Sequence, residues 1–288
     1  GRRHQLVWLP RWGCDGMIFG SNQKLLMARA GVIPVDAGDI SNASYDNVSY
    51  SVGSQEVSPI DVNFNGDGTK MYICGFLSDA VFQYSLSTAY DVSTASYDSV
   101  SLSSRQNNPS GLAFNTNGTK LYINSGNTID QYSLSTAYDV STASYDSASG
   151  SVTSSAYSLR FNSNGTRLFT VNVGSSTIDQ YSLSTAFDIS TLSSRSATFS
   201  VSSQDNSPGG MDFNKNGTKM FVAGYQNDTV YQYSLSTPYT VNTASYDSVS
   251  LDISAQTTLP FGLIFNKDVD KMYVIGNNVT SVLQYSTA

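Results

Sequence analysis

The stretch Gly111–Leu134 reads GLAFNTNGTKLYINSGNTIDQYSL, and variants of it recur along the chain. An apolar run ends in Phe-Asn, an Asn-Gly-Thr segment follows, and a second apolar run leads to Gln-Tyr-Ser. The five Phe-Asn pairs are spaced by 50, 47, 52 and 52 residues and begin at Phe64, Phe114, Phe161, Phe213 and Phe265. A nearly fixed period in this range predicts a repeat architecture.

Each period has room for four strands. In the copy quoted above, alternating apolar residues predict strands over 111–115, 120–124 and 128–134, and a fourth over 144–152 after a polar link. Asn117-Gly118 separates the first two strands and is a strong hairpin signal, with positive φ expected at both residues. Four antiparallel strands in about 50 residues are typical of a β-propeller blade.

The two ends of the chain predict a closed ring. The fifth copy ends after its third strand, while a lone strand of the fourth type, over 44–52, precedes the first copy. Tyr45 of this lone strand lies 19 residues before Phe64, and the same distance separates Tyr246 from Phe265. We therefore expect an all-β, five-bladed propeller over 41–288 in which the N-terminal strand completes the last blade and leaves no free sheet edge. A non-closing stack or a piece of a larger ring is the alternative.

Residues 1–40 do not belong to the repeat. They hold the only histidine, His4, and both tryptophans. Two interpretations stay open: an arm that docks the propeller onto a larger assembly, or an artefact preceding a natural start at Met27. The two cysteines, Cys14 and Cys74, are too few for a disulfide framework, so we expect free thiols, with a single bridge as the alternative.

Composition excludes several classes of function. A net charge of −7 argues against nucleic-acid binding, which requires a basic face, and no run is long and apolar enough to span a membrane. Nucleophilic catalysis is disfavoured, since His4 lies outside the repeat and no G-x-S-x-G elbow occurs. No cysteine or histidine cluster predicts a zinc site. The acidic, Ser/Thr-rich composition favours an extracellular, surface-exposed or virion-associated protein.

The blade motifs resemble those of the YVTN-type, lactonase-like propeller family. The resemblance covers residues 41–288 and rests on Pro109-Ser110-Gly111, on the run from Asn117 to Tyr122, and on Asp228-Thr229-Val230. It implies the propeller fold and the blade, because members of the family include binding proteins as well as enzymes. The blades also resemble repeats of surface and adhesion proteins.

Residues that recur in every blade are interpreted as structural. The Asn of each Phe-Asn pair is expected to cap the following turn with its side-chain oxygen. The Gln of each Gln-Tyr-Ser triplet lies in the middle of a buried strand, so its amide is expected to bond backbone groups of a neighbouring blade. The Tyr of the triplet is expected in the core, with its hydroxyl at a polar rim.

Positions that differ between blades carry the functional hypotheses. The first strand of each blade should line the central channel, where Asp61, Asn63 and Asp212 would converge. Two carboxylates and an amide oxygen suit Ca²⁺, and the resemblance implies a channel metal of this kind in lactonase-like enzymes. Arg160 departs from this pattern, and pairing with Asp61 or Asp212 in a salt-bridged channel is the alternative. A calcium-dependent hydrolase of lactonase or phosphotriesterase type at the channel mouth is the second functional hypothesis.

The first functional hypothesis concerns two sets of loops that share one face: those between blades, and those between the second and third strands of each blade. Amides, hydroxyls and aromatic rings there suit carbohydrate, so we expect a surface or secreted binding propeller that recognises a glycan or another extracellular surface. Solvated loops without a ligand are the alternative, and a propeller that merely spaces other proteins is a third hypothesis. The candidate ligand-binding residues are Gln55, Phe76, Arg105, Asn127, Gln204, Tyr225, Gln226, Gln256 and Asn277.

Overall fold

The structure is a computed structural model, and it describes residues 38–287. The chain divides into one unit over 1–33 and a second over 34–288. The two interpretations of residues 1–40 therefore fall almost entirely outside the described residues, as do His4 and Cys14. Gly38, the first described residue, already lies against Val269 and Asn214 of the propeller, just before its predicted start at residue 41.

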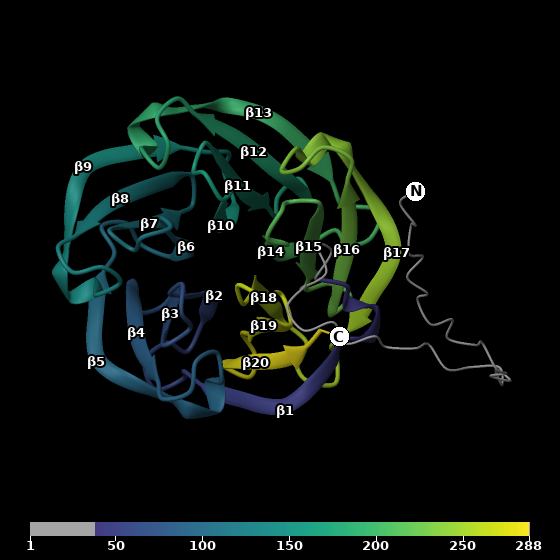
Figure 1. Cartoon of the computed structure of the whole chain (residues 1–288), viewed down its shortest axis with the longest axis horizontal. Helices are drawn as coiled ribbons and strands as arrows, with labels where there is room; N and C mark the ends of the chain where they lie inside the picture. The colour runs from purple at the N-terminus through teal and green to yellow at the C-terminus, as the bar shows by residue number, and fades with distance from the viewer. Residues whose placement is uncertain (1–37, 288) are drawn as a thin grey trace, which may run out of the picture. The chain divides into compact units, whose positions relative to one another are not determined.

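Five four-stranded antiparallel sheets form the blades (Figure 1). Blade 1 contains β2 (Pro59–Phe64), β3 (Lys70–Gly75), β4 (Ala80–Leu86) and β5 (Ala95–Ser103). Blade 2 contains β6 (Pro109–Phe114), β7 (Lys120–Ser125), β8 (Thr128–Leu134) and β9 (Ala143–Ser151). Blade 3 contains β10 (Ala156–Phe161), β11 (Arg167–Asn172), β12 (Thr177–Leu183) and β13 (Leu192–Ser200). Blade 4 contains β14 (Pro208–Phe213), β15 (Lys219–Gly224), β16 (Thr229–Leu235) and β17 (Ala244–Asp252).

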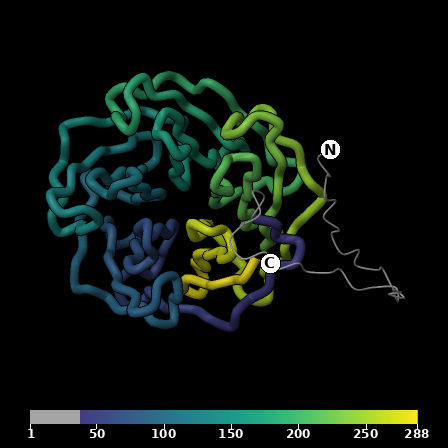
Figure 2. The backbone as a smooth tube through the Cα atoms, in the orientation of Figure 1, coloured from purple at the N-terminus to yellow at the C-terminus, as the bar shows by residue number. Residues whose placement is uncertain are grey.

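The fifth blade closes the ring as predicted. It contains β18 (Pro260–Phe265), β19 (Lys271–Gly276) and β20 (Ser281–Ser286), and β1 (Ser44–Ser51) pairs antiparallel with β20 as its outer strand. The backbone trace shows the first and last strands side by side at this seam (Figure 2). The sheet order β1-β20-β19-β18 confirms that the N-terminal strand completes the last blade.

The first strand of every blade is the innermost one. The strands β2, β6, β10, β14 and β18 contact one another around the centre of the ring, and β1, β5, β9, β13 and β17 form its outer edge (Figure 1). Five apolar clusters fill the five interfaces between neighbouring blades. Both faces of each sheet are thus buried, which explains their apolar and aromatic composition. Cys74 is a buried free thiol within blade 1.

The turn after each inner strand differs from the predicted two-residue hairpin. In blade 2 the N–H of Gly118 donates to the carbonyl of Asn115, and the N–H of Asn115 donates to the carbonyl of Lys120. Gly118 has a φ of 71°, whereas Asn117 is not among the residues with positive φ. The prediction of positive φ at both residues was wrong, because a longer loop ending in one left-handed residue needs only the glycine.

The expectations for the recurring Asn and Gln residues are confirmed. In blade 1 the side-chain oxygen of Asn65 accepts from the N–H of Lys70 and so caps the turn. The side-chain oxygen of Gln83 accepts from the N–H of Val140 in the link after β8, so this amide joins two neighbouring blades. The other four blades repeat this contact through Gln131, Gln180, Gln232 and Gln284.

Helical structure in the described residues is limited to short 3-10 turns. They are η1 (Ile40–Asn42), η2 (Val92–Thr94), η3 (Val140–Thr142), η4 (Ile189–Thr191) and η5 (Val241–Thr243). Among residues 38–287 no helix has the length and apolar character needed to cross a bilayer.

Candidate functional site

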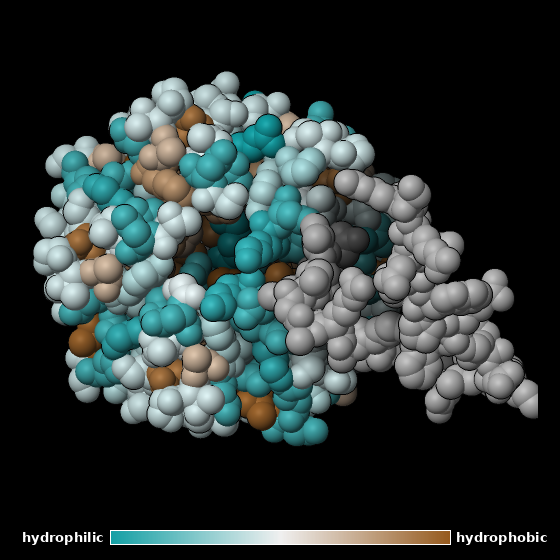
Figure 3. All heavy atoms as spheres, in the orientation of Figure 1, coloured by the Kyte–Doolittle hydropathy of each residue, from teal (hydrophilic) through white to brown (hydrophobic). Residues whose placement is uncertain are grey.

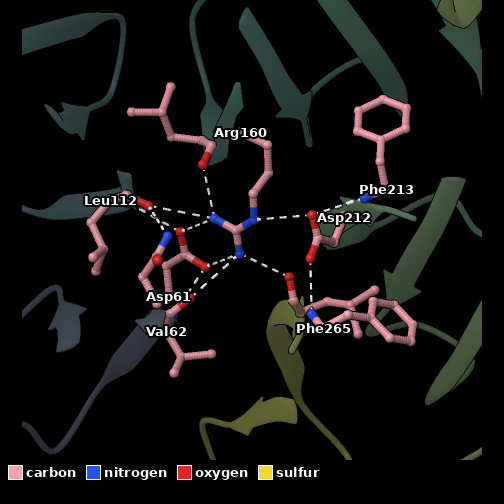
Figure 4. A network of polar contacts seen from close by, with 10 residues as sticks. Asp61, Val62, Leu112, Arg160, Asp212, Phe213 and Phe265 are labelled. Carbon is pink, nitrogen blue, oxygen red and sulfur yellow. Dashed lines mark hydrogen bonds and ion pairs between the residues drawn. The ribbon is translucent and has the colours of Figure 1, made fainter. Parts of the chain in front are cut away.

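Arg160 occupies the centre of the channel (Figure 4). It comes from β10 in blade 3, and its guanidinium donates to both carboxylate oxygens of Asp61 in blade 1, at 3.0 and 3.1 Å. Further donations reach the carbonyls of Leu263, at 2.8 Å, and Leu159, at 2.8 Å. Asp61 is fully buried and Arg160 is 5% exposed. The pairing of Arg160 with Asp61, one of the two alternatives from the sequence, is therefore present.

Asp212 lies on the other side of the same guanidinium. Its Oδ1 is 3.8 Å from Nε of Arg160 and accepts from the N–H of Phe213 at 2.8 Å. Its Oδ2 accepts from the N–H of Phe265 in the next blade, at 2.8 Å (Figure 4). Burial raises the pKa of Asp212 to about 6, although Arg160 and the two N–H groups act in the opposite direction. Its side chain is 16% exposed, so this carboxylate, unlike that of Asp61, reaches solvent.

Two of the three proposed calcium ligands contact a positive charge. Asp61 and Asp212 both contact Arg160, and the amide nitrogen of Asn63 donates to the carbonyl of Leu112. The guanidinium fills the space between the carboxylates, and like charges repel, so this arrangement does not fit a calcium ion. Among residues 38–287 no group of three or more His, Cys, Asp or Glu side chains is placed to hold a metal.

A pocket of about 260 Å³ opens above Asp212, where the inner strands of blades 3, 4 and 5 end. Phe-Asn pairs and turn residues of the three blades form its wall, and the lysines Lys215 and Lys267 contribute exposed positive charge at its rim. The lining residues are Phe161, Ser163, Asp212, Phe213, Asn214, Lys215, Tyr239, Phe265, Asn266, Lys267 and Val269. The space-filling view shows a hollow at the centre of the ring, bordered by hydrophilic and some hydrophobic residues (Figure 3).

The pocket coincides with a missing aromatic side chain. In four blades, the residue two before the 3-10 turn is aromatic, has positive φ and covers the turn glycine. Its ring lies so close that a Cβ on that glycine would approach it to 2.2–2.3 Å. These pairs are Tyr90 on Gly68, Tyr138 on Gly118, Phe187 on Gly165 and Tyr239 on Gly217.

Blade 5 replaces both members of this pair. Gly38 stands at the aromatic position, and Val269 stands at the glycine position with a φ of 58°. A Cβ on Gly38 would lie 2.8 Å from Cγ1 of Val269 and 3.4 Å from Cβ of Asn214, so the valine occupies part of the space that the ring takes elsewhere. Val269 and its neighbours Asn266 and Lys267 line the pocket together with Asp212.

Several of the candidate ligand residues on the loop face use their polar groups in hydrogen bonds within the protein. The amide oxygens of Gln55 and Gln204 accept from the hydroxyls of Tyr84 and Tyr233, both at 3.3 Å. Arg105 donates to Asp130 at 3.3 Å and lies over the ring of Tyr145.

The other candidates on that face fall into two groups. Asn277 donates to Ser58 and to the carbonyl of Pro59, so it joins blade 5 to blade 1. The side chains of Gln226 and Gln256 make no hydrogen bond to the described residues, and Asn127 accepts only from its neighbour Thr128. These three remain candidates for contact with a ligand.

Phe76 and Tyr225, which were predicted as ligand-binding residues, belong to an aromatic cluster with two residues that were not predicted, Tyr157 and Phe261. The ring of Phe76 contacts that of Tyr157 at 5.6 Å, Tyr157 contacts Phe261 at 5.9 Å, and Phe261 stacks on Tyr225 at 5.1 Å between centroids. Tyr157 and Phe261 occupy the second position of an inner strand, where the other blades have Ile60, Ser110 and Gly209. This variation between copies was the signal that could have found them.

Asp212 itself was predicted, but its pocket was not. Gly38 lies within residues 1–40, which the repeat analysis set apart, so its equivalence to Tyr90 was missed. The signal was present in the sequence: Asp39 before Ile40 matches Asp91 before Val92, and each Asp side chain accepts from the N–H two residues ahead.

Comparisons with known proteins identify the fold and no family. No family model matches the chain, and no curated protein matches it. Many solved structures match, however, and two of them are proposed 6-phosphogluconolactonases. That of Bacteroides fragilis is 12% identical at a TM-score of 0.51, covering 79% of this chain and 80% of that one. That of Bacteroides uniformis is 10% identical at a TM-score of 0.51, covering 78% of this chain and 65% of that one.

A third match has a different description. The β-propeller domain of Cps50 (Swd1) from Myceliophteria thermophila is 12% identical at a TM-score of 0.50, and the alignment covers 85% of this chain and 100% of that one. The chain spans less than two thirds of the length of the Bacteroides uniformis protein. At these identities the likeness establishes the propeller fold alone.

Proposed function

We propose that the propeller is a hydrolase of the lactonase or ester type, acting in the pocket above Asp212. The observation that carries this proposal is a partly exposed carboxylate that lines a pocket, where burial raises its pKa to about 6. A general base is most effective when its pKa lies near the working pH, because it is then both deprotonated and basic. Perturbed carboxyl groups in a pocket are also a recognised mark of catalytic sites.

Asp212 would act on a water molecule. The carboxylate removes a proton from the water molecule while the water oxygen attacks the carbonyl carbon of the lactone or ester. The bond from that carbon to the ring or ester oxygen then breaks, and the departing oxygen takes the proton back from Asp212. Lys215 and Lys267 at the rim supply positive charge for the oxyanion that forms in between.

Arg160 would position the base rather than react. Its guanidinium limits how far the pKa of Asp212 rises, and two N–H donors fix the carboxylate in one orientation. The descriptions of the two Bacteroides structures agree with this class of reaction, although that likeness extends only to the fold. No step requires a metal.

Hydrolysis of a panel of substrates tests the proposal. The panel contains p-nitrophenyl acetate, δ-valerolactone and glucono-δ-lactone, followed at pH 7.5 in buffer containing a chelator. We expect turnover of at least one of them, and a loss of about 10²–10⁴-fold in kcat/KM for Asp212→Asn. The rate should rise with pH through an apparent pKa of about 6.

Asp252→Asn is the matched control, because Asp252 is an exposed carboxylate at the end of β17, outside the pocket. It should leave turnover unchanged. Absence of hydrolysis across the panel, or equal rates for the wild type and Asp212→Asn, would overturn the proposal.

A further inference from the structure

Four aromatic rings bridge the end of the channel opposite to the Asp212 pocket. Tyr157 and Phe261 lie near the beginning of the inner strands β10 and β18, whereas the pocket lies where inner strands end. Phe76 and Tyr225 follow β3 and β15 in the turns on the same face. Blades 1 and 3 are not neighbours, so the contact of Phe76 with Tyr157 runs across the ring.

The cluster is assembled from departures from the repeat. Two of the equivalent positions in other blades hold glycine: Gly126 stands at the position of Phe76, and Gly209 at that of Phe261. A Cβ on Gly209 would lie 3.2 Å from Cδ1 of Phe261, so the absence of a side chain there lets the ring approach. Blade architecture alone would not require this asymmetry.

The four rings present both an apolar surface and free polar groups. Phe261 and Tyr225 stack on each other with 30° between their ring planes, and Tyr157 meets Phe261 at a steeper angle of 52°. All four side chains are partly exposed. Within the described residues, the hydroxyls of Tyr157 and Tyr225 and the amide of Gln226 have no hydrogen-bond partner.

We propose that this aromatic cluster is a second binding site, which takes a neutral sugar ring. The apolar C–H face of a pyranose would stack on the face of Tyr225 that is turned away from Phe261, and its hydroxyls would bond the free groups of Tyr157, Tyr225 and Gln226. A purely apolar occupant would leave those polar groups unpaired. The cluster contains no cation and the chain is acidic, which disfavours a phosphorylated ligand. The site does not depend on hydrolysis at Asp212.

Saturation-transfer NMR tests the site with the methyl glycopyranosides of glucose, galactose and mannose, and with indole as a flat apolar probe. We expect at least one glycoside to bind, and its affinity to fall at least tenfold in Tyr225→Ala. Tyr225→Leu, which keeps an apolar side chain but removes the flat ring, should weaken binding similarly. Gln226→Ala should weaken it by a smaller factor and leaves the cluster itself intact.

Leu77→Ala is the matched control, because Leu77 is 68% exposed and follows Phe76 without contributing a ring. It should bind as the wild type does, and so should Asp212→Asn, which separates this site from the proposed catalytic one. The proposal is overturned if no glycoside binds, if indole alone binds, or if binding survives Tyr225→Leu.

Discussion

The guanidinium of Arg160 clamps both carboxylate oxygens of Asp61, at 3.0 and 3.1 Å, although the two residues lie 99 positions apart. They belong to blades 3 and 1, which are not adjacent, so this pair crosses the channel (Figure 4). Asp212 in blade 4 faces the same guanidinium, which also donates to the carbonyls of Leu112 in blade 2 and Leu263 in blade 5, so one side chain connects all five blades.

Arg160→Met should destabilise the ring strongly. It leaves Asp61 charged and fully buried without its partner, and breaking one side of a buried ion pair costs about 3–5 kcal/mol. Urea unfolding at pH 7 measures the loss. The double variant Arg160→Met/Asp61→Asn removes both charges and should recover most of the stability. A double variant no more stable than Arg160→Met would contradict the assignment of the loss to the orphaned carboxylate.

Asp212 should make the protein less stable as the pH rises from about 4 to about 6. Its pKa is about 6 in the folded chain and near 3.8 when unfolded, so the folded state holds more protons in this window. Above pH 6 the ionised carboxylate lowers the free energy of unfolding by its full amount, about 3 kcal/mol at 1.36 kcal/mol per pKa unit. The difference in unfolding free energy between Asp212→Asn and the wild type should therefore grow across this window. Parallel curves of unfolding free energy against pH for the two proteins would refute the raised pKa of Asp212.

A second group of carboxylates should act in the opposite sense. Asp98 accepts from Lys70 and Gln83, and despite partial burial these hydrogen bonds hold its pKa below the ordinary value. Its contribution is complete above about pH 4 and is lost as the pH falls through the lowered folded value. Asp98→Asn should cost about 1–3 kcal/mol at pH 7 and flatten the acid limb of the unfolding curve. Acid titration by circular dichroism checks this; an unchanged acid limb would argue against it.

Restoring the repeat at Gly38 should close the Asp212 pocket. Gly38→Tyr alone is expected to cost about 1–3 kcal/mol, because its Cβ would approach Val269 to 2.8 Å. Gly38→Tyr/Val269→Gly recreates the pair of the other blades and relieves the left-handed valine, so its Tm should exceed that of the single variant. Hydrolysis should fall in the double variant although Asp212 is intact. Full activity with a restored Tm would show that this pocket is not the site.

Local and repeated features were predictable from the sequence. The period fixed the number of blades, strand alternation located the strands, and the lone strand over 44–52 predicted closure through β1 and β20. The capping role of Asn65 and the inter-blade role of Gln83 also followed, because each recurs five times and a repeated residue serves the repeated structure. The turn type was missed, since Asn-Gly fits a two-residue hairpin and a longer loop equally well.

The sequence by itself determined the scaffold, whereas the tertiary structure decided which departures from the repeat meet. Asp61, Arg160 and Asp212 were singled out, but only ring closure shows that the guanidinium fills the position proposed for a cation. The pocket beside Gly38 and the contact of Phe76 with Tyr157 likewise join distant segments. The physical reason is that strand pairing is set by short periodic patterns, while contacts across a channel depend on how five blades curve around an axis that no local pattern encodes.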